Sequence, residues 1–554
     1  MVGKNSHSKM PLEKQTALKA DQDVRAPGTI RGTLLAWNTV LNLAGQVLPL
    51  LVALPAVPYI IHRLGVDRFG VLSLAWAVLN MSTILDLGLG RATTKFVAEY
   101  MGQGKEGQVP SVVWSSLVAQ MPLGLVGGIL LALFTPVVAG RLLRVPASLV
   151  GESETVFYII AASLPLVLAS NPLRGALEAM QRFDLVNYVR VPTTALMFLL
   201  PAGAAAWGVR LPGIVLLLTL VRAAMTLAYL ILCFRTLPIL RRRFSFKGSG
   251  IRQLLAYGGW VMVSNLTAPF FLSLDRFMIG ALLSVAAVSY YTPPWEIARR
   301  TVAFPFSLSS TLFPFFGWHG QKDRDLLCRV SAKACKFILL AMCPVTIVLM
   351  VFAGDILRLW LGADFAKQGA VVLQTLGLSF LLNGLTYVPY TAIQGLGRPD
   401  WKAKLDVFNL FLLGLLFWWL IPGLGINGAA FSTLAVTSFD CVAEFWLSRK
   451  LGVFPLWSPS ARSLWRTMLL SGGLAVAVVT VKSLRLPLGS TALAILALFS
   501  AFVYVFWKVG MEGDERAVLR DWTARLSEVG RPSRALAPGE PSAAEVSLHR
   551  GKSV

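Results

Sequence analysis

Long hydrophobic segments constrain the fold of this chain more than any other feature of its sequence. Fourteen segments can be marked in order: 34–61, 69–89, 112–139, 155–173, 185–207, 212–234, 253–282, 286–316, 335–353, 369–393, 404–421, 425–447, 464–483 and 488–508. A membrane-spanning helix needs about 20 mostly apolar residues, and it satisfies its own backbone hydrogen bonds in lipid. Only 14% of the residues are charged, against about 25% in soluble domains. The sequence therefore predicts an all-α polytopic membrane protein with about fourteen transmembrane helices, and it excludes a soluble enzyme.

The basic residues between these segments predict the orientation of the chain. The sequence holds 51 Lys and Arg residues against 28 Asp and Glu, a formal net charge of +23. With the N-terminus inside, the cytoplasmic loops carry 23 Lys and Arg residues and the outer loops carry nine. Because cytoplasmic loops of membrane proteins are enriched in basic residues, we expect both termini in the cytoplasm. The positive charge then serves orientation, and we expect no nucleic-acid partner.

Three pairs of sequence blocks suggest an internal duplication. The pairs are EAMQRFDL (178–185) with QGLGRPDW (394–401), WGVRLPGI (207–214) with LGINGAAF (424–431), and LGVDRFGVL (64–72) with LSVAAVSYY (283–291). The separations of 216, 217 and 219 residues are nearly constant, which is typical of a repeated unit. Six spans per unit would give both copies the same orientation. The sequence thus predicts two six-helix lobes related by a pseudo-twofold axis along the membrane normal.

This repeat defines the expected domain organisation. The predicted parts are a basic cytoplasmic tail (1–33), an N-lobe with spans 1 to 6 (34–234), a basic cytoplasmic linker (235–252), a C-lobe with spans 7 to 12 (253–447), two extra spans (464–508), and a cytoplasmic tail (509–554) that is disordered beyond about residue 531.

Ionisable residues inside the predicted spans are the candidates for function. They are Arg222, Asp275, Arg276, Glu296, Arg299, Arg300, Asp440 and Glu444. A charge at the bilayer centre costs roughly 2.5–3.5 kcal/mol on insertion scales, so such residues face a polar interior. The helical rise places the first six in one band near mid-membrane, with two more arginines than carboxylates.

Two interpretations of this band stay open. The charges can form interhelical pairs that hold the bundle together. Alternatively, Arg222, Arg276, Arg299 and Arg300 line a cationic cavity between the lobes. Such a cavity suits an anionic cargo, because the planar guanidinium matches phosphate oxygens. Asp275 and Glu296 would then bind a coupling ion or pair with the arginines.

Asp86 and Arg91 lie at the predicted cytoplasmic end of the second span, in LDLGLGRATTKFVAEY (85–100). They are either anchoring charges at a helix end or an inner gate that closes on the second lobe.

The sequence offers little for catalysis, metal binding or cofactor binding. The five cysteines form no CxxC pair, and the four histidines form no HExxH motif, so no metal is predicted. A GxGxxG at Gly102, Gly104 and Gly107 follows no strand, and the chain lacks a GxxxxGK[ST] loop. We therefore predict a protein that is not an enzyme and carries no cofactor.

Several blocks resemble the bacterial polysaccharide transporters, the Wzx-type lipid-linked oligosaccharide flippases. These blocks are residues 64–100, SLDRFMIGALLSVAAVSYY (273–291) and residues 394–430. The resemblance covers roughly residues 34–450 and extends to the superfamily that includes MurJ and the MATE exporters. The Asp275–Arg276 pair matches a "DR" that recurs in this family.

The resemblance implies alternating access in the bacterial inner membrane. It implies an undecaprenyl-pyrophosphate-linked O-antigen, capsule or exopolysaccharide unit as cargo, with the pyrophosphate at the four arginines. It also implies polysaccharide polymerase machinery as a partner, and a lipid groove shaped by the two extra spans.

Two other functions are alternatives to the flippase. A MATE-like exporter of small organic cations is disfavoured by a cationic cavity. A glycan polymerase or ligase needs a long outer loop with reactive groups, whereas the longest outer loops (140–154 and 354–368) contain no His. The coupling ion stays open between H⁺ and Na⁺, although a carboxylate that stays ionised beside arginines favours Na⁺ or a structural pair.

Overall fold

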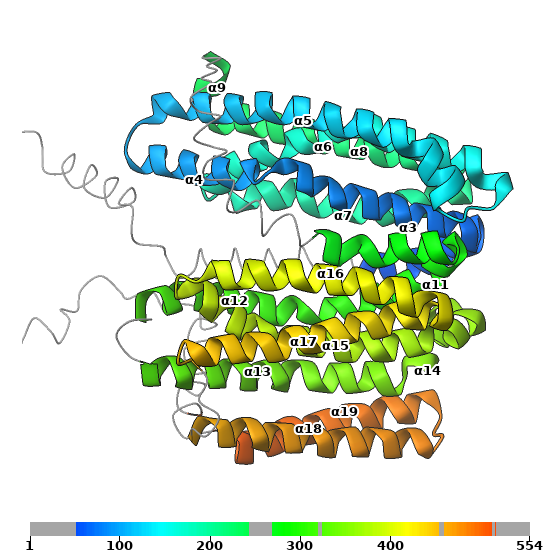
Figure 1. Ribbon diagram of the computed structural model, residues 1–554, viewed down its shortest axis with the longest axis vertical. Helices are drawn as coiled ribbons and strands as arrows, with labels where there is room; N and C mark the ends of the chain where they lie inside the picture. Colours follow the sequence, from blue (N-terminus) through cyan, green and yellow to red (C-terminus); the bar gives the residue numbers. More distant parts are fainter. Residues whose placement is uncertain (1–50, 243–268, 320–323, 454–458, 512–515, 517–554) are drawn as a thin grey trace, which may run out of the picture. The chain divides into compact units, whose positions relative to one another are not determined.

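The computed structural model describes residues 51–242, 269–319, 324–453, 459–511 and 516 (Figure 1). The regular elements of these residues are all helices. The predicted N-terminal tail, residues 243–252 of the linker and the tail beyond residue 516 lie outside the described residues. The chain forms two compact units, residues 1–455 and residues 456–554.

Eleven helices in the described part of the chain are long and apolar enough to cross a membrane. Each of them overlaps one predicted segment. The other three predictions are of two kinds: segments 34–61 and 253–282 fall partly outside the described residues, and segment 286–316 is divided into shorter helices. The all-α polytopic fold is therefore confirmed, and the total of fourteen spans stays a prediction.

The first unit begins with the helices that the sequence assigns to the N-lobe. They are a helix over Leu51–Leu64, α3 (Val66–Met81), η1 (Ser82–Asp86), α4 (Leu89–Gly102), η2 (Glu106–Gln108), α5 (Val109–Val137), η3 (Val138–Leu142), η4 (Ala147–Leu149), α6 (Val150–Ala179), α7 (Phe183–Ala206), α8 (Leu211–Thr236) and α9 (Ile239–Arg242).

The remaining helices of the first unit belong to the predicted C-lobe. They are a helix over residues 269–282, α11 (Val285–Arg299), η5 (Arg300–Val302), α12 (Ala303–His319), α13 (Arg324–Val351), α14 (Ala353–Leu361), α15 (Ala363–Gly395), α16 (Pro399–Leu424) and α17 (Ile426–Lys450). The second unit is a helical hairpin of α18 (Pro459–Ser483) and α19 (Leu488–Val505), followed by η6 (Phe506–Gly510).

Small residues let helices α5 and α6 approach closely. A Cβ atom on Gly124 would collide with the backbone of Pro165, and one on Gly128 would lie 2.5 Å from the Ala161 carbonyl oxygen. Gly124 and Gly128 are four residues apart, so they share one face of α5. Membrane helices associate through such small-residue faces because lipid provides no hydrophobic drive between them.

The predicted span 286–316 is broken at η5, between α11 and α12. Pro293 and Pro294 lie inside α11, and the helix continues through them. Pro305 lies in the first turn of α12, where its ring would clash with the carbonyl of residue 301 in a continuous α-helix. The interruption therefore follows from Pro305, and it places Arg299 and Arg300 at the bend.

The loops at Arg182 and Arg398, which belong to one pair of corresponding sequence blocks, have the same hydrogen bonds. The Arg182 N–H donates to the Leu177 carbonyl at 3.0 Å, and the Arg398 N–H donates to the Ile393 carbonyl at 3.1 Å. Each arginine then forms an ion pair with an aspartate two residues later, Asp184 and Asp400. In the second pair of blocks, Gly208 and Gly425 both have positive φ. In the third pair, Gly65 and Ser284 are both N-cap residues, of α3 and α11, but their φ angles differ, at 80° and −169°.

Helices α3 and α11 join the two halves of the first unit. Ser289 Oγ donates a hydrogen bond to the Val66 carbonyl oxygen at 2.5 Å, and the Arg144 N–H donates to the Gly280 carbonyl oxygen at 2.9 Å. Gly70 has no room for a Cβ atom beside the Val285 backbone. These contacts lie at the end of the bundle that the loop charges assign to the outer face.

Candidate functional site

Trp295, which contacts two arginines, forms the centre of the predicted cationic site. The guanidinium carbon of Arg276 lies 4.0 Å from the centroid of the Trp295 ring, and that of Arg299 lies 5.1 Å from it. Trp295 is buried at 4% exposure, and its ring also packs edge-to-face on Phe380 with centroids 6.0 Å apart. Cation–π contacts of this kind hold arginines in place without using their N–H donors.

Glu296 forms ion pairs with two of the arginines near Trp295. Its Oε1 lies 3.5 Å from Nη2 of Arg276, and its Oε2 lies 3.4 Å from Nη2 of Arg300. In contrast, the buried Nε atoms of Arg299 and Arg300 have no hydrogen-bond partner among the described residues. Three arginines against one carboxylate leave this group, which we call the Trp295 cluster, with an excess of positive charge and unused donors.

Two predicted residues lie apart from this arrangement. Arg222 belongs to α8 in the first half, and its buried Nε has no hydrogen-bond partner in the described part of the chain. Asp275 is 3% exposed, and its Oδ1 accepts the backbone N–H of Arg276 at 2.8 Å. The structure thus brings Arg276, Glu296, Arg299 and Arg300 together, with Asp275 adjacent in sequence.

Asp86 has its hydrogen-bond partners within the first half. Its Oδ1 accepts hydrogen bonds from the side-chain amides of Gln120 in α5 and Asn171 in α6, the latter at 3.3 Å, and its Oδ2 accepts the Gly90 N–H at 3.3 Å. An acceptor at this point satisfies a free N–H in the first turn of α4. Arg91 is exposed on the next position. The gate role of Asp86 and Arg91 stays a prediction.

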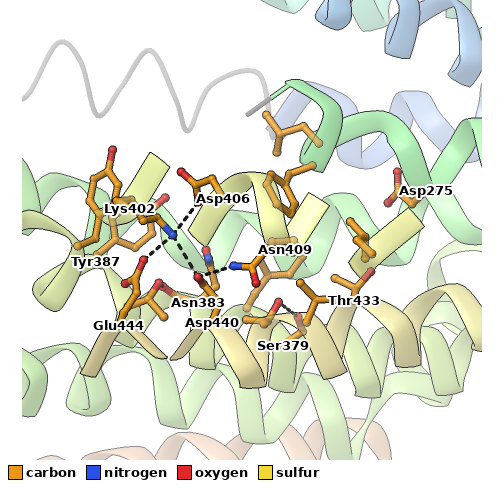
Figure 2. A pocket seen from close by; sticks show the side chains of 18 of the residues that line it. Asp275, Ser379, Asn383, Tyr387, Lys402, Asp406, Asn409, Thr433, Asp440 and Glu444 are labelled. Atoms are coloured by element: carbon orange, nitrogen blue, oxygen red, sulfur yellow. Dashed lines mark hydrogen bonds and ion pairs between the residues drawn. The ribbon is translucent and has the colours of Figure 1, made fainter. Parts of the chain in front are cut away.

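A cavity of about 520 Å³ lies inside the second half (Figure 2). Its walls come from the helix over residues 269–282 and from α11, α12, α15, α16 and α17. Trp295 is one of the lining residues, so the cavity shares a wall with the Trp295 cluster. Sites for small molecules commonly have volumes of about 300–1,000 Å³.

One end of the cavity holds a buried lysine among three carboxylates. Lys402 Nζ lies 2.8 Å from Asp406 Oδ1, 3.2 Å from Asp440 Oδ1 and 2.5 Å from Glu444 Oε1. Asn409 Nδ2 donates to Asp440 Oδ1 at 2.7 Å. Figure 2 shows these side chains converging from α16 and α17, with Asp275 on the opposite side of the view. We call this group the Lys402 cluster.

The two clusters have opposite charge. One ammonium group faces three carboxylates in the Lys402 cluster, and the side chains are only 1–18% exposed. Charges this deeply buried are stable only when they are paired, so Lys402 is essential to the arrangement. The described residues contain no group of three or more His, Cys, Asp or Glu side chains suited to a metal ion.

The Lys402 cluster was not predicted from the sequence. Lys402 was expected in a cytoplasmic loop, because the hydrophobic run begins at residue 404, whereas the structure places this residue inside α16 at 8% exposure. The signal was present in the spacing: Lys402 and Asp406, and Asp440 and Glu444, are each four residues apart and share a helix face.

Comparisons with known proteins agree with this fold. A family model described as "Polysaccharide biosynthesis protein" matches residues 62–368. A protein named "Putative O-antigen transporter" from Shigella flexneri is 24% identical over 414 residues, which cover 75% of this chain and 97% of that protein.

Two solved structures share the architecture. The structure titled "Lipid II flippase MurJ, inward closed conformation" superposes with a TM-score of 0.67 at 11% identity, covering 85% of this chain and 99% of that one. The inward-facing structure of a multidrug resistance MATE family transporter of the MOP superfamily gives a TM-score of 0.65 at 16% identity, covering 74% of this chain and 98% of that one. These similarities show the fold, and the family match covers more than half of the 554 residues. The chain therefore belongs to the polysaccharide biosynthesis protein family.

Proposed function

We propose that this protein is a flippase that moves an undecaprenyl-pyrophosphate-linked oligosaccharide from the inner to the outer leaflet of the bacterial cytoplasmic membrane. Family membership and the Shigella relative, named as a putative O-antigen transporter, support a lipid-linked glycan as the cargo. The site contributes a cationic cluster inside a polytopic bundle, and we propose transport by alternating access rather than an enzymatic reaction.

The observation that carries this proposal is the Trp295 cluster. Arg276 and Arg299 both lie within cation–π distance of the Trp295 ring, and the buried Nε atoms of Arg299 and Arg300 have no hydrogen-bond partner among the described residues. Preorganised arginine donors form strong, charge-assisted hydrogen bonds to phosphate oxygens. We propose that the pyrophosphate binds here, with Arg222 of the first half as a further contact in another stage of the cycle.

The contact between α3 and α11 supports alternating access. The halves meet through the Ser289–Val66 and Arg144–Gly280 hydrogen bonds at the predicted outer end. A bundle closed at this end would receive its cargo from the cytoplasmic side, which is the side on which a lipid-linked glycan to be exported must enter.

The test uses a strain that lacks the gene. We expect lipid-linked oligosaccharide to accumulate in the cytoplasmic leaflet and wild-type protein to clear it. The double variant Arg299→Ala/Arg300→Ala should not clear it, whereas Arg182→Ala, an exposed loop arginine, should act as wild type. Absence of accumulation would overturn the flippase function, and clearance by the double variant would overturn only the pyrophosphate site.

We also propose that H⁺ or Na⁺ drives transport through Asp275, whose carboxylate lines the cavity. Glu296 is assigned a pairing role, since both of its oxygens face arginines of the Trp295 cluster. Asp275→Asn should abolish the dependence of transport on one of the two ion gradients, and the affected gradient identifies the ion. Unchanged transport across pH and sodium concentration would contradict this role.

The membrane topology and the partner follow from the same proposal. We expect both termini in the cytoplasm and a functional association with polysaccharide polymerase machinery. Cysteine labelling from either side of the membrane tests the topology, and co-purification from cross-linked cells tests the association.

The Lys402 cluster favours one second candidate, a MATE-like exporter of small organic cations. Its excess of carboxylates beside the aromatic walls of the cavity would attract a cation. An exporter would lower the cellular accumulation of a lipophilic cation such as ethidium, and this effect would be lost in Asp406→Asn.

A further inference from the structure

The cavity between the Trp295 cluster and the Lys402 cluster has a row of aromatic rings along one wall. The rings are those of Phe380, Tyr387 and Tyr390. Together with Asn383 they are spaced by three or four residues, so all four share one face of α15. The separation of ten residues between Phe380 and Tyr390 corresponds to about 15 Å of helix. Phe380 packs on Trp295 with ring centroids 6.0 Å apart at one end, and Lys402 Nζ lies 5.7 Å from the Tyr390 ring at the other.

Polar groups accompany this row of rings. Asn383 lies on the same face of α15 as the rings, and Asn409 and Thr433 also line the cavity. Asn409 is 2% exposed, and its Oδ1 has no hydrogen-bond partner among the described residues. A buried acceptor without a partner is costly in a folded protein. A ligand that brings hydroxyl donors would satisfy it.

Aromatic rings beside amides and carboxylates match the surface of a sugar. A pyranose ring has a face of C–H groups that packs against the electron-rich face of an aromatic ring. Its hydroxyl groups both donate and accept hydrogen bonds, as do the side chains of Asn and Thr. The cavity therefore offers both kinds of contact that a neutral saccharide needs.

The position of the cavity matches the covalent order of the proposed cargo. In a lipid-linked glycan the first sugar is bonded directly to the pyrophosphate. Trp295 contacts Arg276 and Arg299 and is also a lining residue of the cavity. A pyrophosphate at the Trp295 cluster would place the attached sugar beside Trp295, at the Phe380 end of the aromatic row.

The charge of the Lys402 cluster narrows the class of sugar. Three carboxylates face one ammonium at the far end of the cavity. In a poorly solvated site this excess repels anions strongly. The cavity would thus reject both a second pyrophosphate and an acidic sugar.

We propose that this cavity is a sugar-binding subsite that receives the uncharged, pyrophosphate-proximal sugars of the lipid-linked glycan. This assignment rests on the proposed flippase function. It adds that the second half of the protein determines which glycan is bound. This selectivity combines packing of the sugar against aromatic rings with exclusion of negatively charged sugars.

The test measures binding to the full-length protein in lipid nanodiscs with three short-chain polyprenyl pyrophosphates. One probe carries no sugar, one carries N-acetylglucosamine and one carries glucuronic acid. We expect the N-acetylglucosamine probe to bind about tenfold more tightly than the bare pyrophosphate, which corresponds to about 1.4 kcal/mol. The glucuronic acid probe should show no such gain. This ranking on the wild-type protein requires no substitution.

Two variants locate the effect in the cavity. Asn383→Leu should remove the tenfold gain and leave binding of the bare pyrophosphate unchanged. Asp406→Asn should strengthen binding of the glucuronic acid probe, because it removes one repelling charge. Asp364→Asn, an exposed carboxylate at the start of the same helix α15, is the matched control and should change none of the three affinities.

The outcomes separate this inference from the proposed function. Equal affinity for the bare and the N-acetylglucosamine probes would overturn the subsite while leaving the pyrophosphate site intact. A sugar-dependent gain that survives Asn383→Leu would also overturn it. If the wild-type protein bound none of the three probes, both the pyrophosphate site and the sugar subsite would be overturned. Binding of the N-acetylglucosamine probe alone would support the subsite and refute the pyrophosphate site.

Discussion

The two halves of the first unit share the geometry of one loop but bury different polar groups. In the first half, Asp86 is held by two neutral amides and a backbone N–H. In the second half, Lys402 is held by three carboxylates. At the repeat offset of 216 residues, Val186 and Arg190 occupy the positions of Lys402 and Asp406. Val186 lies in an apolar core, so the charged cavity is a property of the second half.

This difference indicates that the repeat preserves the ends of helices more strictly than their interiors. The loop at Arg182 and Asp184 and the loop at Arg398 and Asp400 have the same hydrogen bonds and ion pairs. Loop geometry fixes how consecutive helices are joined, whereas interior residues can change when the neighbours on facing helices change with them. We infer that the second half contains the sugar subsite, whereas the first half contributes Arg222 to the proposed pyrophosphate contacts.

The largest expected effect comes from removing the ammonium group of Lys402 in the second half. Lys402→Met leaves three carboxylates buried without a counter-charge, and breaking a buried ion pair typically costs about 3–5 kcal/mol. We expect a marked fall in the unfolding temperature of the purified protein. Lys404→Met, on the same helix but exposed, should leave it unchanged. Equal unfolding temperatures for the two variants would refute the structural role of Lys402.

A smaller effect is expected from the polar cluster of the first half. Asp86→Ala leaves the amides of Gln120 and Asn171 without their shared acceptor, and an unsatisfied buried polar group costs about 1–3 kcal/mol. The unfolding temperature should fall, but by less than in Lys402→Met. Glu106→Ala, at an exposed position in η2, is the control. A larger loss for Asp86→Ala than for Lys402→Met would reverse the comparison between the halves.

The smallest effect is expected where the halves are alike. The ion pairs of Arg182 and Arg398 are exposed, with side-chain exposures of 43–51%, and solvent screens such pairs. Arg182→Ala and Arg398→Ala should each leave the unfolding temperature and glycan transport close to those of the wild type. A loss of transport in only one variant would show that one loop contacts a partner or the cargo.

Part of the site could be predicted from the sequence. Glu296, Arg299 and Arg300 lie three or four residues apart on one helix, so local spacing was sufficient to group them. Asp275 and Arg276 followed from the estimated depth in the membrane. In contrast, Trp295 could not be predicted, because a single aromatic residue in an apolar helix forms no pattern. Its ring nevertheless contacts both Arg276 and Arg299.

The sequence by itself determined the all-α membrane fold and the shared loop geometry at Arg182 and Arg398. These features depend on hydrophobic length and on local backbone preferences, both of which are encoded within short stretches of chain. Only the tertiary structure decided which buried charges meet. The pairing of Lys402 with Asp440 and Glu444 joins helices α16 and α17, and helix spacing cannot show which faces turn toward each other. The cavity exists for the same reason, since its walls come from helices distant in sequence.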